Sequence, residues 1–151
     1  MGRSSDLFEG DMKRILISAI ALLSIGTWAI ANAQDYKCKV ERITGSVEQD
    51  ARRAGGHLLG QEFSVDRISG VMVGPPGLKN SFHTNTQPKI IDSGSKENSF
   101  KVVATRASQP GSQVYVLVVE EWREGPFKPF TFLDGSSVGI PVFFGTCRHV
   151  S

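Results

Sequence analysis

Short apolar or alternating segments, separated by closely spaced turn residues, fill the chain from residue 35 to its end. In residues 62–66, Phe63 and Val65 fall on one face and Ser64 and Asp66 on the other, which is the period-two alternation of a half-buried strand. Many short strands with turns between them are typical of an antiparallel sandwich or a small barrel. We therefore predict a mainly β domain with about seven or eight short strands and at most one short helix.

The strand predictions follow from alternation, from apolar runs and from the turn residues that bound them. Residues 114–119 are apolar on both faces, which favours a central strand. Gly70 can adopt the positive φ of a tight hairpin turn, and Pro75 and Pro76 end the pairing that follows it. The predicted strands are 35–42, 61–66, 71–74, 89–92, 99–107, 114–122, 130–133 and 138–147.

One short helix is predicted between the first two strands. Ser46 and Gln49 have the spacing of a capping box, in which each side chain bonds a free backbone N–H of the first turn. Val47, Ala51 and Ala54 share one helical face, and two glycines at 55–56 can end the helix. A loop over the same residues is the alternative.

The N-terminal residues have the three parts of a cleavable signal peptide. Lys13 and Arg14 precede an apolar run at 15–30, and Ala31-Asn32-Ala33 is a small-x-small cleavage site. The run is shorter than the ~20 residues that a membrane-spanning helix needs. We predict that residues 1–33 are an N-terminal extension plus signal peptide, starting at Met1 or Met12. Cleavage after Ala33 leaves a periplasmic or secreted domain, 34–151, without membrane insertion.

The two cysteines, Cys38 and Cys147, lie near opposite ends of this predicted mature domain. An even number of cysteines in an exported chain predicts a disulfide. Closing a loop of roughly 110 residues would contribute about 4–5 kcal/mol on the chain-entropy model. A redox-active pair is disfavoured, since the C-x-x-C spacing is absent.

Composition and motifs argue against several classes of function. The formal net charge is +2 without a basic stripe, so we expect no nucleic-acid binding. His57, His83 and His149 lack metal-site spacing and are interpreted as unrelated surface residues, with His149 in the tail after Cys147. No G-x-S-x-G, S-x-x-K or P-loop motif is present. Glu120 and Glu121 are interpreted as the end of a strand in solvent. We therefore predict no metal, no cofactor and no enzymatic activity.

Aromatic residues are concentrated in the C-terminal third of the chain. Most of them are expected in the core, but in a barrel a few could line an apolar pocket or form a patch for a protein partner. Phe130 and Phe132 are predicted to share a face, while Phe143 and Phe144 point to opposite faces. The candidate pocket or interface residues are Phe130, Phe132, Phe143, Phe144, Tyr115 and Trp122.

Four stretches of the chain resemble a group of small exported proteobacterial proteins of unknown function. They are 62–81 (with EFSVDRISGVMVG and LKNS), 89–103 (KIIDSGSKENSFKVV), 128–133 (KPFTFL) and 143–147 (FFGTC). The resemblance covers about half of the mature chain and implies a periplasmic location. It implies no activity and no catalytic residues.

Two functions are consistent with these observations. The first is a non-enzymatic periplasmic binding module that holds a small apolar ligand or a protein partner. The second is an inhibitor or envelope-stress protein that acts on another macromolecule through a polar loop at 75–88.

Overall fold

Eight antiparallel strands form one continuous sheet in this computed structural model. The structure describes residues 35–80, 88–108, 111–136 and 139–150, which belong to one unit, Ala33–Ser151. The predicted signal peptide and residues 81–87 of the predicted loop at 75–88 lie outside the described residues. The strands are β1 (Asp35–Thr44), β2 (Glu62–Val65), β3 (Met72–Val73), β4 (Lys89–Ser93), β5 (Phe100–Ser108), β6 (Gly111–Val119), β7 (Lys128–Asp134) and β8 (Val142–Val150).

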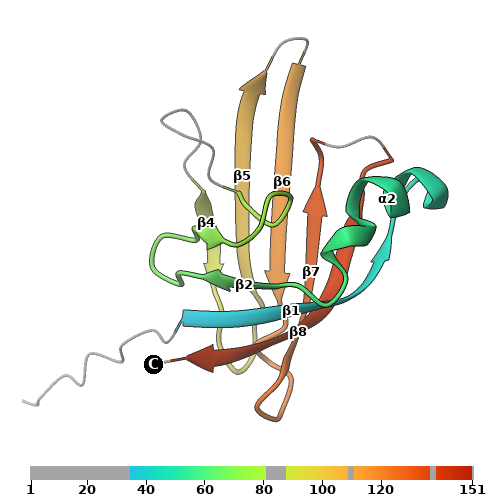
Figure 1. The fold of residues 1–151 in the computed structure, drawn as a ribbon. Coiled ribbons are helices and arrows are strands. Elements are labelled where there is room, and N and C mark those ends of the chain that lie inside the picture. Colours follow the sequence, from blue (N-terminus) through green and yellow to red (C-terminus); the bar gives the residue numbers. More distant parts are fainter. Residues whose placement is uncertain (1–34, 81–87, 109–110, 137–138, 151) are drawn as a thin grey trace, which may run out of the picture. The chain divides into compact units, whose positions relative to one another are not determined.

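The strand order is β3-β2-β1-β8-β7-β6-β5-β4, and every neighbouring pair is antiparallel. The sheet curls into a half-barrel: β5, β6 and β7 run nearly upright in Figure 1, while β1 and β2 cross them. The predicted fold class is confirmed, and of its two alternatives the single curled sheet excludes a two-sheet sandwich. The prediction that the strand at 114–119 is central is also confirmed.

The core lies on the concave face of the sheet. Residues of alternate parity point inward from each long strand, as the pleat requires. Tyr36 and Val40 on β1, Val102 on β5 and Leu117 on β6 are at most 1% exposed. Leu58 and Leu78, from segments between the strands, complete the same cluster.

The predicted helix is present, but its predicted cap is not. An α-helix, α2, spans Glu48–Gly55 and continues into a 3-10 turn, η1, at Gly56–Leu58. The N-cap residue is Val47, without a side-chain cap, and the Ser46 hydroxyl donates instead to the Gly139 carbonyl at 3.0 Å. The capping-box prediction was therefore wrong, because a contact from a distant segment takes the serine. Of the described helices, none has the length and apolar character needed to cross a membrane.

The hairpin of β2 and β3 folds over toward the opposite end of the sheet. Its turn contains Gly70 at φ 73°, as predicted, and a Cβ there would lie 2.9 Å from Cγ1 of Val102 on β5. Asp66 accepts hydrogen bonds from the backbone N–H groups of Ser69 (2.9 Å) and Ile68 (2.7 Å). These bonds hold the pKa of the Asp66 carboxyl below its usual value. The turn is thus fixed locally and packed closely against β5.

The predicted disulfide joins Cys38 and Cys147, which are directly opposite each other on β1 and β8. Both cysteines are fully buried. The bond links residues 109 positions apart in the chain. Restriction of the unfolded chain by such a link contributes about 4–5 kcal/mol on the chain-entropy model.

The segment after β3 is anchored in the core at two positions. Leu78 is fully buried, and Asn80 is 1% exposed. The Asn80 side chain accepts from the Met72 N–H and donates to the Gly70 carbonyl, both at 2.8 Å. The described part of the loop at 75–88 is therefore part of the fold, and a deletion of the whole loop would remove core contacts.

We expect Asn80→Ala to destabilise the protein by about 2–4 kcal/mol, because it leaves a buried N–H and a buried carbonyl without partners. Asn98→Ala, at an exposed asparagine, should change stability by less than about 0.5 kcal/mol. Urea unfolding of the two variants measures the difference. Equal stability would contradict the role given to Asn80.

Candidate functional site

Four of the aromatic candidates are core residues. Phe130, Phe132, Phe143 and Tyr115 are at most 2% exposed. The rings of Phe132 and Phe143 stack at 5.9 Å between centroids, and Phe130 meets Phe63 edge to face at 5.2 Å. These rings fill the concave side of the half-barrel, so the part of the interior that they occupy is packed with the protein's own side chains.

The other two candidates lie at the surface. Phe144 points to the outer face of the sheet, opposite to Phe143 as predicted, and the Arg42 guanidinium lies 4.1 Å from its ring centroid. Trp122 is 43% exposed, and the Arg123 guanidinium lies 4.2 Å from its ring. Trp122 therefore remains available to a partner.

Trp122 belongs to the β6–β7 loop, 120–127, which is fixed by hydrogen bonds at its base. The Glu120 N–H donates to the Pro129 carbonyl at 2.8 Å, and the Lys128 ammonium donates to the carbonyls of Glu121 and Arg123. Phe127, at the other end of the loop, is 59% exposed. Two large aromatic side chains are thus held in solvent by an ordered loop.

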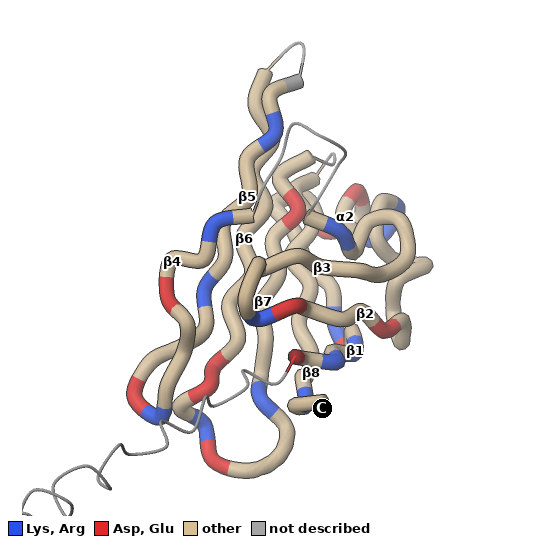
Figure 2. The backbone as a smooth tube through the Cα atoms, turned by 90° about the vertical axis from the view of Figure 1, so that its left-hand side faces the viewer, with Lys and Arg blue, Asp and Glu red and all other residues tan. Residues whose placement is uncertain are grey.

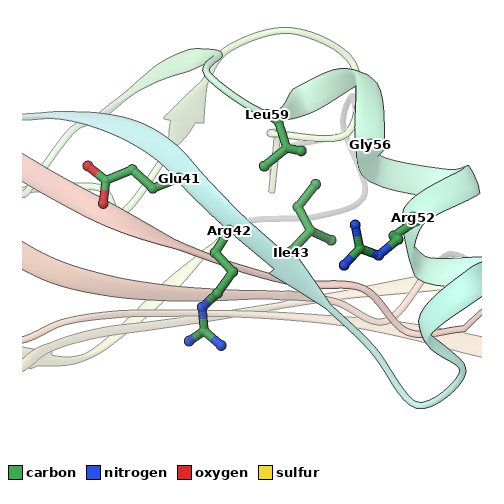
Figure 3. A pocket seen from close by; sticks show the side chains of 6 residues that line it. All are labelled: Glu41, Arg42, Ile43, Arg52, Gly56 and Leu59. Carbon is green, nitrogen blue, oxygen red and sulfur yellow. The ribbon is translucent and has the colours of Figure 1, made fainter.

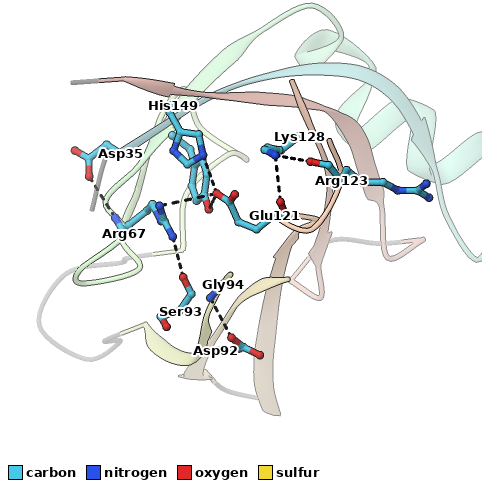
Figure 4. Close-up of polar contacts among 10 residues, drawn as sticks. Asp35, Arg67, Asp92, Ser93, Gly94, Glu121, Arg123, Lys128 and His149 are labelled. Atoms are coloured by element: carbon cyan, nitrogen blue, oxygen red, sulfur yellow. Dashed lines mark hydrogen bonds and ion pairs between the residues drawn. The ribbon is translucent and has the colours of Figure 1, made fainter. Parts of the chain in front are cut away.

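Glu121 is the centre of a polar cluster that joins distant segments (Figure 4). Its Oε1 accepts a hydrogen bond from the Tyr36 hydroxyl on β1. The same oxygen lies 2.9 Å from Nε2 of His149 on β8 and 3.9 Å from Nη1 of Arg67 in the β2–β3 turn. The Glu121 side chain is only 10% exposed, so these three side chains take the place of much of the water that would otherwise solvate its carboxyl group.

Arg67 extends this cluster to β4, the far edge strand of the sheet. Its Nη2 donates to the Ser93 carbonyl at 2.9 Å, and its backbone N–H donates to Asp35 at 3.3 Å. The guanidinium also lies 5.0 Å from the Tyr36 ring centroid, which is within range of a cation–π contact. Arg67 therefore ties the β2–β3 hairpin to both β1 and β4.

Gly94, just after β4, allows Glu121 to approach. Its φ is 74°, and a Cβ there would lie 3.0 Å from Cγ of Glu121. Any larger residue would be strained in this backbone conformation and would press on the Glu121 stem. The glycine thus positions β4 against the cluster.

Burial raises the pKa of the Tyr36 hydroxyl well above its usual value of 10.0, and the hydrogen bond to Glu121 raises it further. Tyr36 is therefore a neutral donor to a carboxylate. Because all three partners converge on one oxygen of Glu121, the arrangement is that of a structural tie. It links four segments that are far apart in the sequence.

The sequence interpretation of two cluster residues was wrong. Glu121 was expected in solvent at a strand end, but it is buried, while its neighbour Glu120 is the partly exposed partner of Arg123 at 2.9 Å. His149 was interpreted as an unrelated surface residue of the C-terminal tail, but it lies on β8 beside Tyr36. Local patterns carry no signal for the place of either residue in the cluster, because their partners come from β1 and the β2–β3 turn.

Of the other two histidines, only His57 can be placed relative to this cluster, and it does not join it. His57 is exposed in η1, and His83 lies outside the described residues. Within the described ranges, no group of three or more His, Cys, Asp or Glu side chains is placed to hold a metal ion.

A small cavity lies between β1 and the α2–η1 segment (Figure 3). Its volume is about 170 Å³, below the 300–1,000 Å³ of typical ligand pockets. Its two guanidinium groups already have partners: Arg42 covers Phe144, and Arg52 bonds Glu48 at 2.8 Å. The lining residues are Glu41, Arg42, Ile43, Arg52, Gly56 and Leu59.

Comparisons with models of protein families, with curated proteins and with solved structures found no match.

We expect Glu121→Ala to destabilise the fold by about 3 kcal/mol, at the low end of the range for removing one partner of a buried charge pair. The matched control is Glu120→Ala, which removes a more exposed pair and should cost less than about 1 kcal/mol. Thermal and urea unfolding of both variants test this. Similar losses in the two would show that Glu121 is no more important than a surface charge.

Tyr36 should remain neutral up to the pH at which the protein unfolds. Because its folded pKa is raised, its contribution to stability is complete below about pH 10 and is lost as the pH rises above that value. Tyr115→Phe leaves Tyr36 as the only tyrosine, so absorbance at 295 nm reports its ionisation alone. The absorbance should rise together with the loss of the far-ultraviolet circular dichroism signal. A rise near pH 10 with the sheet intact would contradict the assignment.

Proposed function

We propose that the protein is a non-enzymatic binding module that acts outside the cytoplasm, after export and cleavage following Ala33. The Cys38–Cys147 disulfide supports this location, because such bonds persist mainly in oxidising compartments. The partner that we propose is a protein, bound through the β6–β7 loop.

The observation that carries this proposal is the exposure of Trp122 and Phe127 on an ordered loop. Tryptophan is among the residues that contribute most to protein interfaces, and large apolar groups gain from leaving water. A loop that is already fixed loses little conformational entropy on binding. Both factors favour recognition by this loop.

A small apolar ligand in the interior is the weaker candidate, since the aromatic side chains expected to line such a site are packed against one another. Inhibition through residues 75–88 is also less favoured, because Leu78 and Asn80 are engaged in the core. Neither idea has an observation in its favour comparable to the exposed aromatic pair.

The test compares Trp122→Ala/Phe127→Ala with the unchanged protein, both expressed from the full sequence. Each is immobilised and exposed to an extract from the organism that encodes it, and the retained proteins are quantified by mass spectrometry. We expect one protein that the unchanged chain retains to be missing from the double variant. The affinity of the double variant for that protein should be about 30-fold or more lower, as for an interface hot spot.

The matched control is Ile68→Ala, which removes another exposed apolar side chain, 79% exposed, on the β2–β3 turn. It should retain the partner with unchanged affinity. If the loop variant retains the same proteins as the control, recognition through the loop is excluded.

A further inference from the structure

Strand β6 is apolar on both of its faces, although only its inner face contributes to the core. A sheet with one face on a core and the other in water normally alternates apolar and polar residues. The outward side chains of β6 keep part of their surface in solvent, and Val114 is 39% exposed. The inward set is Tyr115, Leu117 and Val119, and the outward set is Val114, Val116 and Val118.

The register of the sheet extends this outward apolar character over four strands. Directly paired residues form two rows across the sheet, about 7 Å apart along the strands. One row contains Val103, Val116, Leu133 and Val142. The other contains Lys101, Val118, Thr131, Phe144 and Arg42. We name the six apolar members the outer patch: Val103, Val116, Val118, Leu133, Val142 and Phe144, all partly exposed.

The outer patch has basic residues at its edges. Arg42 stands at one end of the second row, and at the other end Lys101 is paired with Asp92 on β4; Lys89 on β4 stands at the end of the first row. On the same outer face, Lys39 and Arg148 follow on β1 and β8, beside Glu41, which accepts a hydrogen bond from the Thr146 hydroxyl. Figure 2 marks basic positions along β5, whereas β4 carries one Lys and one Asp. Asp92 lies 3.7 Å from Lys101, and both side chains remain partly exposed. Basic positions outnumber acidic ones at these edges, so the edges favour carboxylates on whatever covers the patch.

We propose that the outer patch docks an amphipathic segment of a protein partner, with apolar residues flanked by Asp or Glu. This inference rests on the proposed function, since it assigns a second contact surface to the same binding module. The apolar rows supply area to bury, and the basic edges set the charge of the partner.

Two other occupants are less compatible with these observations. A second copy of the chain would bring the basic edges of two patches together, and like charges across an interface are unfavourable. A lipid surface is usually entered by protruding aromatic side chains, whereas the patch consists mainly of short valine side chains along the sheet. Valine has few rotamers to lose, which suits packing against another protein surface.

The probes for the test are random peptides displayed on phage and selected on the full-length protein. We expect enrichment of peptides that combine apolar residues with Asp or Glu. Their affinity should fall on the order of tenfold or more in Val116→Lys, which places a charge in the middle of the patch. It should also fall at high salt, because exposed charges are screened.

Three further variants complete the design. Val116→Thr keeps the shape of the side chain and should give a smaller loss, which separates binding from a folding defect. Ser64→Lys adds the same charge on the outer face of β2, away from the patch, and should leave the affinity unchanged. Trp122→Ala/Phe127→Ala should bind the selected peptides normally, so a failure of the proposed loop function does not affect this result.

The proposal is overturned if the selected peptides lack acidic residues or bind Val116→Lys as tightly as the unchanged protein. It is also overturned if sedimentation shows a dimer that Val116→Lys dissociates, since the occupant is then a second copy. Binding to phosphatidylglycerol vesicles that Val116→Lys abolishes would likewise replace the protein partner by a lipid surface.

Discussion

The pairing of β1 with β8 is the contact on which the rest of the sheet depends. Nine residue pairs join these strands, from opposite ends of the described chain, and the Cys38–Cys147 disulfide lies among them. Without this ladder, β1, β2 and β3 would have no connection through the sheet to the other five strands, β4 to β8. Such distant pairing must overcome the entropy of closing a long loop, and a covalent link lowers that cost by restricting the unfolded chain.

The curl that this ladder produces brings the two open ends of the sheet toward each other. Gly70 packs on β5, and Arg67 reaches the Ser93 carbonyl at the end of β4, without strand pairing between these ends. Closing the gap with a guanidinium requires a buried counter-charge, and Glu121 provides it. The polar cluster is therefore a consequence of leaving the barrel half closed: side chains make the connection that backbone hydrogen bonds make elsewhere in the sheet.

Sequence patterns predicted the strands, the turn and the disulfide, but they missed the contacts that form only when the sheet curls. Alternation predicted the strands, cysteine number predicted the disulfide, and Gly70 predicted the hairpin turn. The contact between Glu121 and His149 in the polar cluster could not be predicted, because their partners approach from other strands. Ser46 illustrates the same limit: it has the spacing of a capping residue, but Gly139, far away in the chain, accepts its hydroxyl.

The central position of β6 in the sheet explains why its inner face is apolar, but not why its outer face is. A central strand in a parallel sheet is covered on both faces, but in an antiparallel half-barrel centrality accounts for the inner face alone. Domains are generally built from two or more packed layers, and an apolar sheet face gains free energy only when a second layer removes it from water. The described chain supplies the inner layer through α2, η1 and the segment after β3. The outer rows on β5 to β8 therefore have the composition of a face that is meant to be covered, and the basic residues at their ends restrict what can cover them.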